Sequence, residues 1–458
     1  MIHPLLDGLV GLLTLGVSYV VAVHPFRHRQ DLSDHVRRLA PLAWLARVGG
    51  AFFTYYFYLL YYGGGDVINY IHDSLQLVQS FILKPGPTID YLLFSLTRRD
   101  YRTYFDINPE YFHFIAENNL YLGYTHDFAS QTVGVLTFPF SLLTLGSVNG
   151  TIALFSTFSF HASFKFFLSL QKVYPRSWER AAIPVLFLPS VISWIALPFK
   201  EAYALLFILN GIRKIIIEPA SLLSRIAAFI LLYFAYVVKP YVIISMIPLF
   251  GFMLLQSIGT KAKRDFYLYS LYILVGPMIL GLSFYLLVLA AESSGKYSFE
   301  KVAHQAYLVQ TDLTRNVLYY TETGGSVYDI GEFEPTIEGM LSKFPIAFYT
   351  GLFRPFLWEA KKGVILLAAI ETTFLLGYVA YGLLTYGIMR VLRSIVSHKW
   401  SLLLMIFAVF FIFMMGLTSG NFGNLVRYRV PGIFFFYLVI FAAYGQLSAE
   451  ATHSRRGQ

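Results

Sequence analysis

The sequence contains no cysteine. This absence excludes disulfide bonds, thiolate metal sites, iron–sulfur clusters and cysteine nucleophiles. Charged residues are also scarce, at 13% of the chain, whereas soluble globular proteins average about 25%. Nucleotide-binding loops of the G-x-x-x-x-G-K-S/T type, dinucleotide fingerprints and HExxH pairs are missing as well. A substrate that needs a cytosolic nucleotide cradle is therefore not expected.

Apolar residues dominate instead. Of the 458 residues, 57% are hydrophobic and 18% are aromatic, and long apolar stretches recur from end to end. A helix of about 20 such residues crosses the hydrocarbon core of a bilayer. We therefore expect an all-α polytopic membrane protein with roughly 11–13 transmembrane helices and residues 1–458 forming one membrane domain. The expected spans are 5–23, 42–62, 128–146, 150–170, 181–197, 202–217, 222–238, 241–257, 266–290, 363–389, 400–418 and 431–447.

Two long regions do not span, 63–127 and 291–362, and we expect both to be external loops. In the first loop, apolar residues recur at helical spacing over 89–96, which predicts a helix lying in the interface plane. A second short helix is expected to begin at Pro109, with Asn108 as its N-cap. The second loop mixes polar, charged and glycine residues, which is typical of a loop that becomes ordered on ligand binding.

The formal charge of +9 lies mainly in short links between apolar spans. Such a distribution orients loops toward the cytoplasm and does not indicate a nucleic-acid partner. The link 24–47 carries five arginines and should be cytoplasmic, which places Asp66 on the extracytoplasmic side. Basic residues at the C-terminus place the start of the last span outside as well. Two full spans between 128 and 170 would place the basic links 172–180 and 212–217 on the wrong side of the membrane. Either one apolar segment there is re-entrant, or the charge rule fails locally.

The stretch LYYGGGDVINYIHDS, residues 60–74, places Asp66 directly after three glycines. At the outer end of a helix, the partial negative charge of unpaired carbonyls would make this aspartate a stronger base. If the stretch continues as a helix, Asp66 and Asp73 share a face, and the second carboxylate positions a metal or a hydroxyl. Both are candidate catalytic residues, and both would be ligands if a divalent metal ion binds. The alternative is an acid that marks the membrane exit, with glycines ending the helix.

The stretch GNFGNLVRYRVPG, residues 420–432, suggests an anion site. In an extended segment Arg427 and Arg429 would point the same way, and Pro431 would begin the following helix. Two guanidiniums beside a helix N-terminus suit a phosphate or pyrophosphate. The alternative is a pair of interfacial arginines that contact lipid headgroups.

Two further segments carry charge close to apolar runs. Arg354 lies in a short apolar helix at 344–363 that Pro355 interrupts, so the segment is expected to be re-entrant or interfacial. Its cations and aromatic residues would hold a sugar and a lipid phosphate, or form an aromatic belt with snorkelling lysines. Lys200 and Glu201 are expected at the tip of an apolar hairpin, where a neighbouring ionic pair is costly and often functional.

An acid outside an early span, interfacial helices, many spans and a late NLVRYRVP together resemble the GT-C-type integral membrane glycosyltransferases. The stretches PSVISW, PFKE and LFRPFLWEA also resemble membrane proteins of bacterial envelope-polysaccharide synthesis. The resemblance implies a polyprenyl-phosphate-linked sugar as donor, and a glycan, lipid or protein as acceptor, in the bacterial inner membrane. It assigns the catalytic base or metal-orienting role to Asp66 and the donor phosphate to Arg427 and Arg429. GT-C members often show paired acids, whereas Asp66 stands alone between Gly65 and Val67.

Three other functions remain open. A polymerase of polysaccharide repeat units would depend on arginines of two external loops more than on Asp66. A lipid-linked sugar flippase or other transporter would show inverted repeats, and no repeat is visible in the sequence. A non-enzymatic membrane scaffold would give no reason for aspartate and arginine side chains to converge. In every case membrane lipids surround the chain.

Overall fold

A computed structural model describes residues 3–96, 101–120, 127–218, 221–247, 249, 299–315 and 327–456. In these residues the chain is helical, and the only strand-like pairing is an isolated bridge between Val327 and Asn421. The chain forms two compact units. Unit 1 comprises residues 1–168, 186–211 and 222–239, and unit 2 comprises residues 169–185, 212–221 and 240–458.

Five helical segments of the described chain are long and apolar enough to cross a membrane: Pro4–Arg27, Val148–Val173, Gly363–Tyr386, Lys399–Thr418 and Val430–Thr452. This architecture is that of an α-helical membrane protein, as the composition predicts. The number of spans differs from the expected dozen, because several predicted spans are shorter, broken or more polar than a full crossing. The predicted span 266–290 lies outside the described residues, as does most of 241–257.

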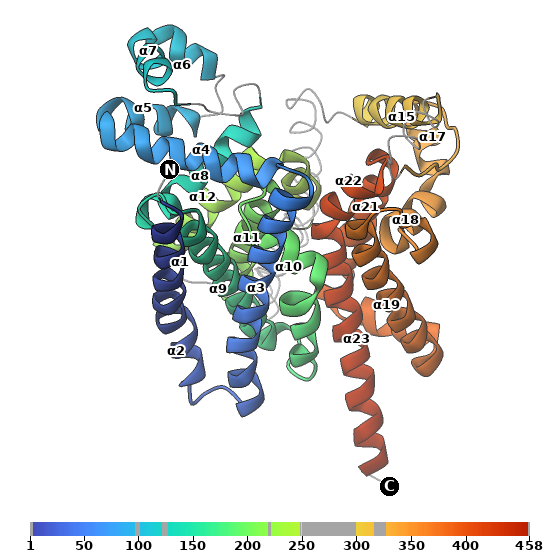
Figure 1. The fold of residues 1–458 in the computed structure, drawn as a ribbon. Helices are drawn as coiled ribbons and strands as arrows, with labels where there is room; N and C mark the ends of the chain where they lie inside the picture. The colour runs from blue at the N-terminus through green and yellow to red at the C-terminus, as the bar shows by residue number, and fades with distance from the viewer. Residues whose placement is uncertain are drawn as a thin grey trace, which may run out of the picture. The chain divides into compact units, whose positions relative to one another are not determined.

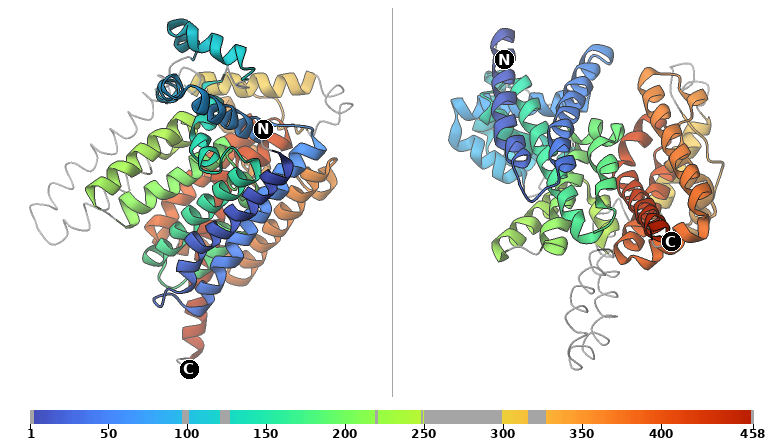
Figure 2. Two further views of the ribbon diagram at one scale, coloured as in Figure 1. Left: turned by 60° about the vertical axis from the view of Figure 1, so that its left-hand side comes forward. Right: turned by 90° about the horizontal axis from the view of Figure 1, so that it is seen from below.

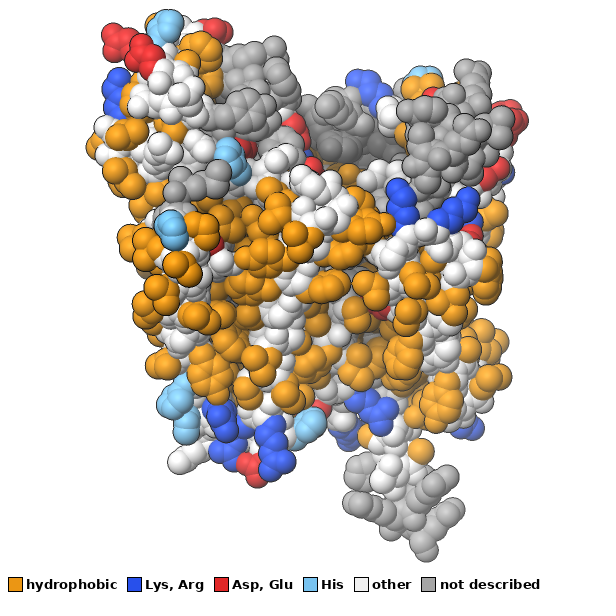
Figure 3. All heavy atoms as spheres, in the orientation of Figure 1, with side chains coloured by type: hydrophobic (Ala, Val, Ile, Leu, Met, Phe, Trp, Pro, Cys, Tyr) orange, Lys and Arg blue, Asp and Glu red, His pale blue; other side chains and the backbone are white. Residues whose placement is uncertain are grey.

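Unit 1 begins with a hairpin of two long segments. The first contains α1 (Pro4–Ser18), a π-helical turn (Tyr19–Val23) and α2 (His24–Arg27), and the second is α3 (Asp34–Tyr61). All but the last residue of the predicted span 42–62 lies within α3, which does not reach the apolarity of a span because it contains arginines and several tyrosines. Figure 3 shows an apolar band over these helices, with basic side chains at its lower edge near the loop that follows α2. That edge is opposite the end of α3 from which the chain continues to Asp66.

The region expected to be the first external loop, 63–127, contains four helices: α4 (Asp66–Leu83), α5 (Pro85–Ser95), α6 (Tyr101–Ile107) and α7 (Pro109–Glu117). In α5 the face with Thr88, Tyr91 and Ser95 is buried, whereas Ile89 and Leu93 are exposed. An exposed apolar face next to membrane spans agrees with the predicted interfacial position. Helix α7 begins at Pro109 as predicted, but the Asn108 side chain donates to the Tyr104 carbonyl at 3.1 Å instead of capping α7.

The middle of unit 1 contains α8 (Phe128–Leu143), α9 (Val148–Val173), α10 (Pro189–Ile195), α11 (Lys200–Gly211) and α12 (Leu222–Val238). The predicted single span 181–197 is wrong, since this stretch consists of a 3₁₀ turn (Trp178–Ala181), a π-helical turn (Ile183–Phe187) and α10. Leu188 is extended because the residue before a proline avoids the helical region. Helix α10 and the segment Lys200–Ile215, which includes the start of the π-helix Ile212–Ile217, meet at 103°. Together they form a broken span or re-entrant loop.

Unit 2 contains α15 (Phe299–Arg315), α17 (Ile337–Ser342), α18 (Phe344–Phe353), a 3₁₀ turn (Leu357–Glu359), α19 (Gly363–Tyr386), α20 (Ile388–Ser397), α21 (Lys399–Thr418), α22 (Phe422–Tyr428) and α23 (Val430–Arg456). The predicted spans 363–389, 400–418 and 431–447 correspond to α19, α21 and α23. Where it is described, the expected external loop 291–362 is largely helical. Helix α18 has ten residues, too few for a full crossing, as expected of a re-entrant or interfacial segment.

Candidate functional site

Asp66 is the first residue of α4 and does not lie at the carbonyl end of α3. The glycines before it form a turn in which Gly63 has φ 68° and Gly65 has φ 147°, backbone conformations that favour glycine. Figures 1 and 2 show α4 crossing the end of α3 instead of continuing it. The helix-end argument for a stronger base is therefore wrong, because the N-terminal end of a helix stabilises a carboxylate. Asp66 is half-buried in unit 1.

The face of α4 that carries Asp66, Tyr70 and Asp73 includes contacts with α8. The Tyr70 hydroxyl lies 3.2 Å from the Ser130 hydroxyl, and a Cβ added at Gly134 would lie 3.1 Å from Asp73 Cβ. Asp73 is 4% exposed, so an acceptor hydroxyl cannot reach it without displacing protein atoms. Its carboxylate acts on Tyr91 of α5: burial raises the pKa of the Tyr91 hydroxyl, and the charge of Asp73 adds to that increase. Asp73 is therefore a buried residue of the contact between α4 and α8.

The turn before α4 approaches the bend between α10 and α11 through one aromatic side chain. A Cβ added at Gly65 would lie 2.6 Å from Tyr58 Cδ1, and the Tyr58 ring centroid lies 6.2 Å from that of Phe199. Phe199 directly precedes Lys200, the first residue of α11. Aromatic contacts thus connect the start of α4 to the start of α11 within unit 1.

An ion pair joins the starts of α8 and α11. The Lys200 ammonium pairs with the Asp127 carboxylate, and Asp127 also accepts hydrogen bonds from the Ser130 hydroxyl at 2.5 Å and the Ala129 N–H at 3.2 Å. Partial burial opposes ionisation of Asp127, but Lys200 and these hydrogen bonds outweigh it, so its pKa lies below the usual value. Lys200 is therefore held beside the start of α8. The face of α4 that carries Tyr70 and Asp73 is turned toward the same helix.

A second ion pair lies one residue further along α11. Glu201 is 2% exposed and Lys239, which follows α12, is 8% exposed, with their charged atoms 2.8 Å apart. The charges of Lys239 and Glu201 both act on Lys200, so Asp127, Lys200, Glu201 and Lys239 form one cluster. We call these four residues the charge cluster. Two acids and two lysines near the end of a broken span are costly to bury and mark a functional-site candidate.

Sequence reasoning found only half of the charge cluster. Lys200 and Glu201 stood out as neighbours between apolar runs, whereas Asp127 and Lys239 were missed. Each of the missed residues has a signal in the sequence: Asp127 directly precedes an apolar run, and Lys239 stands between such a run and Pro240. An isolated charged residue at the edge of an apolar run is common. Only the ion pairs seen in the structure therefore identify Asp127 and Lys239 as members of the charge cluster.

The arginines of unit 2 do not form the predicted pair. Residues 422–428 are helical (α22), so Arg427 and Arg429 do not point the same way as they would in an extended segment. Arg429 is 2% exposed, and its Nη1 donates to the carbonyls of Gly351 at 2.9 Å and Arg354 at 2.5 Å. It thus holds the carbonyl end of α18 against the start of α23. Arg427 is half-buried, with its guanidinium 5.7 Å from the Tyr428 ring centroid.

Arg354 is also committed to protein contacts. It forms an ion pair with Glu359, with Nε donating to the carboxylate at 2.8 Å. Its guanidinium lies 5.5 Å from the Tyr328 ring centroid and 5.1 Å from that of Phe422. Arg354, Arg427 and Arg429 thus belong to unit 2, whereas Asp66, Asp73, Lys200 and Glu201 belong to unit 1.

A metal site built on Asp66 and Asp73 is not supported by their spacing. The two residues are seven positions apart on one helix, which separates their backbones by about 10.5 Å, too far for both carboxylates to reach one ion. Among the described residues no group of three or more histidine, aspartate or glutamate side chains could hold a metal. In the described residues, the divalent metal ion that the sequence suggested for Asp66 and Asp73 thus has no set of ligands.

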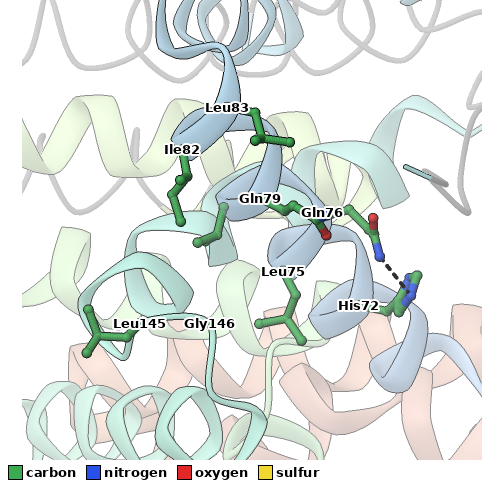
Figure 4. A pocket seen from close by; sticks show the side chains of 9 residues that line it. His72, Leu75, Gln76, Gln79, Ile82, Leu83, Leu145 and Gly146 are labelled. Carbon is green, nitrogen blue, oxygen red and sulfur yellow. Dashed lines mark hydrogen bonds between the residues drawn. The ribbon is translucent and has the colours of Figure 1, made fainter. Parts of the chain in front are cut away.

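A groove of about 280 Å³ lies elsewhere along α4, next to the turn between α8 and α9. Figure 4 shows His72 and Gln76 on its wall, joined by a hydrogen bond of 3.2 Å, with Leu145 across the groove. Neither Asp66 nor Asp73 lines it, so the groove does not include the two candidate carboxylates.

No protein-family model, no curated protein and no solved structure matches this chain.

Proposed function

We propose that the chain is a membrane glycosyltransferase that moves a sugar from a polyprenyl phosphate to a glycan, lipid or protein acceptor. The reaction would take place on the extracytoplasmic side of a bacterial inner membrane. The observation that carries this function is the arrangement of unit 1: an aspartate-bearing face of α4 packs on α8, whose first turn is ion-paired with Lys200. An acid and an ammonium near one membrane edge match the two charges that sugar transfer from a phosphate requires.

In this mechanism Asp66 accepts the proton of the acceptor hydroxyl. The hydroxyl oxygen forms a bond to the anomeric carbon, and the bond from that carbon to the phosphate oxygen breaks, with its electron pair remaining on the polyprenyl phosphate. The Lys200 ammonium and the N–H groups at the start of α11 stabilise the added negative charge. Asp127 and Asp73 position Lys200 and α4. No soluble cofactor takes part.

The roles differ from those first expected. Arg429 is assigned to the packing of α18 and α23, because it is buried and bonded to backbone carbonyls. Arg354 and Arg427 are partly exposed and remain candidates for contact with a second lipid phosphate. Such arginines would matter most in the alternative function, polymerisation of lipid-linked repeat units.

A transporter of lipid-linked sugars is a second candidate, favoured by the 103° break between α10 and α11. Broken helices with half-helix N-termini directed at anionic substrates are typical of secondary transporters. Lys200 begins such a half-helix.

The test is transfer of labelled sugar from a polyprenyl phosphate by the purified protein in liposomes. Asp66→Asn should lower kcat/KM by roughly 10²–10⁴-fold, and Lys200→Gln should raise KM for the donor. Asp90→Asn, an exposed aspartate of α5, is the matched control and should retain activity. Full activity of Asp66→Asn would favour the polymerase. Movement of the labelled lipid across the bilayer without sugar transfer would favour the transporter.

A further inference from the structure

Helix α20 connects two membrane spans of unit 2. It follows Gly387, whose φ of 79° allows the chain to turn sharply after α19, and it precedes α21. Its ten residues measure about 15 Å, half the thickness of a hydrocarbon core. Because α19 and α21 are both candidate spans, α20 lies at the membrane surface where both of them end.

The contact of α20 with α23 marks the depth of that surface. The Ser394 hydroxyl donates to Gln446 Oε1 at 3.0 Å. Helix α23 is almost entirely apolar up to Gly445, and its sequence becomes polar from Gln446 to its last residues. Helix α20 is therefore level with the change from apolar to polar side chains on its neighbour.

Three sectors divide the surface of α20. Val391 and Ile395 are buried against the protein. Beside them, four apolar side chains are exposed: Ile388 at 56%, Met389 at 73%, Leu392 at 48% and Val396 at 59%. The remaining sector carries Arg390 and Arg393, both exposed. The helix thus has a protein-facing, an apolar and a basic side.

The basic sector has little acidic compensation. Residues 386–400 include three basic residues apart from histidine and no acid, and neither Arg390 nor Arg393 pairs with an acid of the described chain. The neighbouring segment 172–180 adds Lys172, Arg176 and Arg180 and contacts this region through a 2.9 Å hydrogen bond between His398 Nε2 and the Val173 carbonyl. The acids nearby are Glu218, paired with Lys172, and the exposed Glu179 and Glu450.

We propose that α20 is an in-plane lipid-binding helix that recognises anionic phospholipid headgroups of the leaflet in which α19 and α21 end. Its apolar sector enters the boundary between headgroups and acyl chains, and Arg390 and Arg393 bind lipid phosphates. Charge and exposed apolar area select this partner together, because a soluble anion would leave the apolar sector in water. The surface is independent of the proposed sugar transfer.

For the test, the 458-residue chain is reconstituted in bilayers of zwitterionic lipid containing phosphatidylglycerol and then purified. The phosphatidylglycerol fraction of the lipid that stays bound to the protein is compared with its fraction in the bilayer. Wild type should bind phosphatidylglycerol above its bulk fraction, with less enrichment at high salt. Arg390→Gln combined with Arg393→Gln should weaken this binding roughly 30-fold, which corresponds to the loss of two basic residues that each contribute about 1 kcal/mol near an anionic surface. Lys301→Gln combined with Lys343→Gln is the matched control, because these exposed and half-exposed lysines lie outside the candidate spans and outside segment 344–363.

Three results would overturn the assignment: unchanged enrichment in the double arginine variant, an equal loss in the lysine control, or equally tight binding of soluble glycerol phosphate. Monodisperse elution and an unchanged thermal unfolding midpoint in zwitterionic lipid establish that the arginine variant is folded. If that variant fails to fold, Leu392→Ser with Val396→Ser serves in its place and should also reduce enrichment. Unchanged enrichment in this second variant would equally overturn the assignment.

Discussion

The Lys239 ammonium lies 2.8 Å from the Glu201 carboxylate, and both side chains are buried. Lys239 follows α12 and Glu201 is in the first turn of α11, so the pair joins two helices that pack together in unit 1. A buried pair of this kind is weak evidence for stability by itself, because desolvation opposes the attraction. Removing one partner is a different matter, since it leaves the other charge buried alone.

Glu201→Gln should therefore lower the stability of unit 1 by about 3–5 kcal/mol. The double substitution Glu201→Gln with Lys239→Met should recover much of this loss, because it removes both charges. Thermal unfolding in detergent micelles measures the effect. Asp31→Asn, which breaks the exposed pair with Arg29, is the control and should have little effect. Equal losses in the single and double variants would show that the two charges are not coupled.

Acid should weaken the contact between α8 and α11. Asp127 has a pKa below its ordinary value of about 3.9, owing to Lys200 and its hydrogen bonds despite the burial that opposes ionisation. Its stabilising contribution is complete above that ordinary value and is lost as the pH falls through the lower folded-state pKa. At pH values below about 4, the unfolding temperature of wild type should therefore decrease. The decrease should be steeper than that of Asp127→Asn. Asp90→Asn should follow wild type, and identical slopes for Asp127→Asn and wild type would refute the role of this pair.

Helices α18 and α21 approach so closely that glycine is required on both sides of their contact, at Gly351 and at Gly416. A Cβ added at Gly416 would lie 1.9 Å from the Ala347 carbonyl oxygen, a backbone atom that cannot move away alone. Gly416→Ala should destabilise unit 2 by about 1–3 kcal/mol, the usual cost of overpacking. Gly377→Ala in α19 meets no atom within 4 Å and should be neutral or slightly stabilising. Chemical denaturation of both variants in the same detergent checks this prediction, which fails if the two behave alike.

Arg429 should be needed for folding more than for binding. Arg429→Gln removes hydrogen bonds to the Gly351 and Arg354 carbonyls, at a cost of about 2–3 kcal/mol. Arg427→Gln, on the same short segment but half-buried, should have a smaller effect on the unfolding temperature. If Arg429 were a phosphate ligand instead, its variant would unfold like wild type and lose only affinity for the donor.

Much of the helical architecture could be predicted, because the length of an apolar run is a local property of the chain. The runs at 5–23, 150–170, 363–389, 400–418 and 431–447 are long enough to cross a bilayer, and each corresponds to a helix that can span. The predicted span 181–197 failed for a reason that is also in the sequence: Pro184 and Pro189 interrupt it, and Pro198 follows it directly. A hydropathy pattern averages over such breaks.

The candidate site was less predictable. Three glycines before Asp66 are compatible with the end of one helix or the start of another, and only the packing of α4 on α8 selects the second. Similarly, the stretch around Arg429 reads equally well as extended or helical. Its burial follows from contacts with α18, which is far away in the sequence.

By itself, the sequence determined that this chain is a helical membrane protein without cysteine chemistry, because composition and apolar run length act residue by residue. Tertiary structure alone decided that Asp127 faces Lys200, that Lys239 faces Glu201 and that Arg429 is enclosed. Each of these outcomes depends on side chains from distant segments meeting where water is scarce. There, the free energy of a charge depends on its partner and not on its neighbours in the chain.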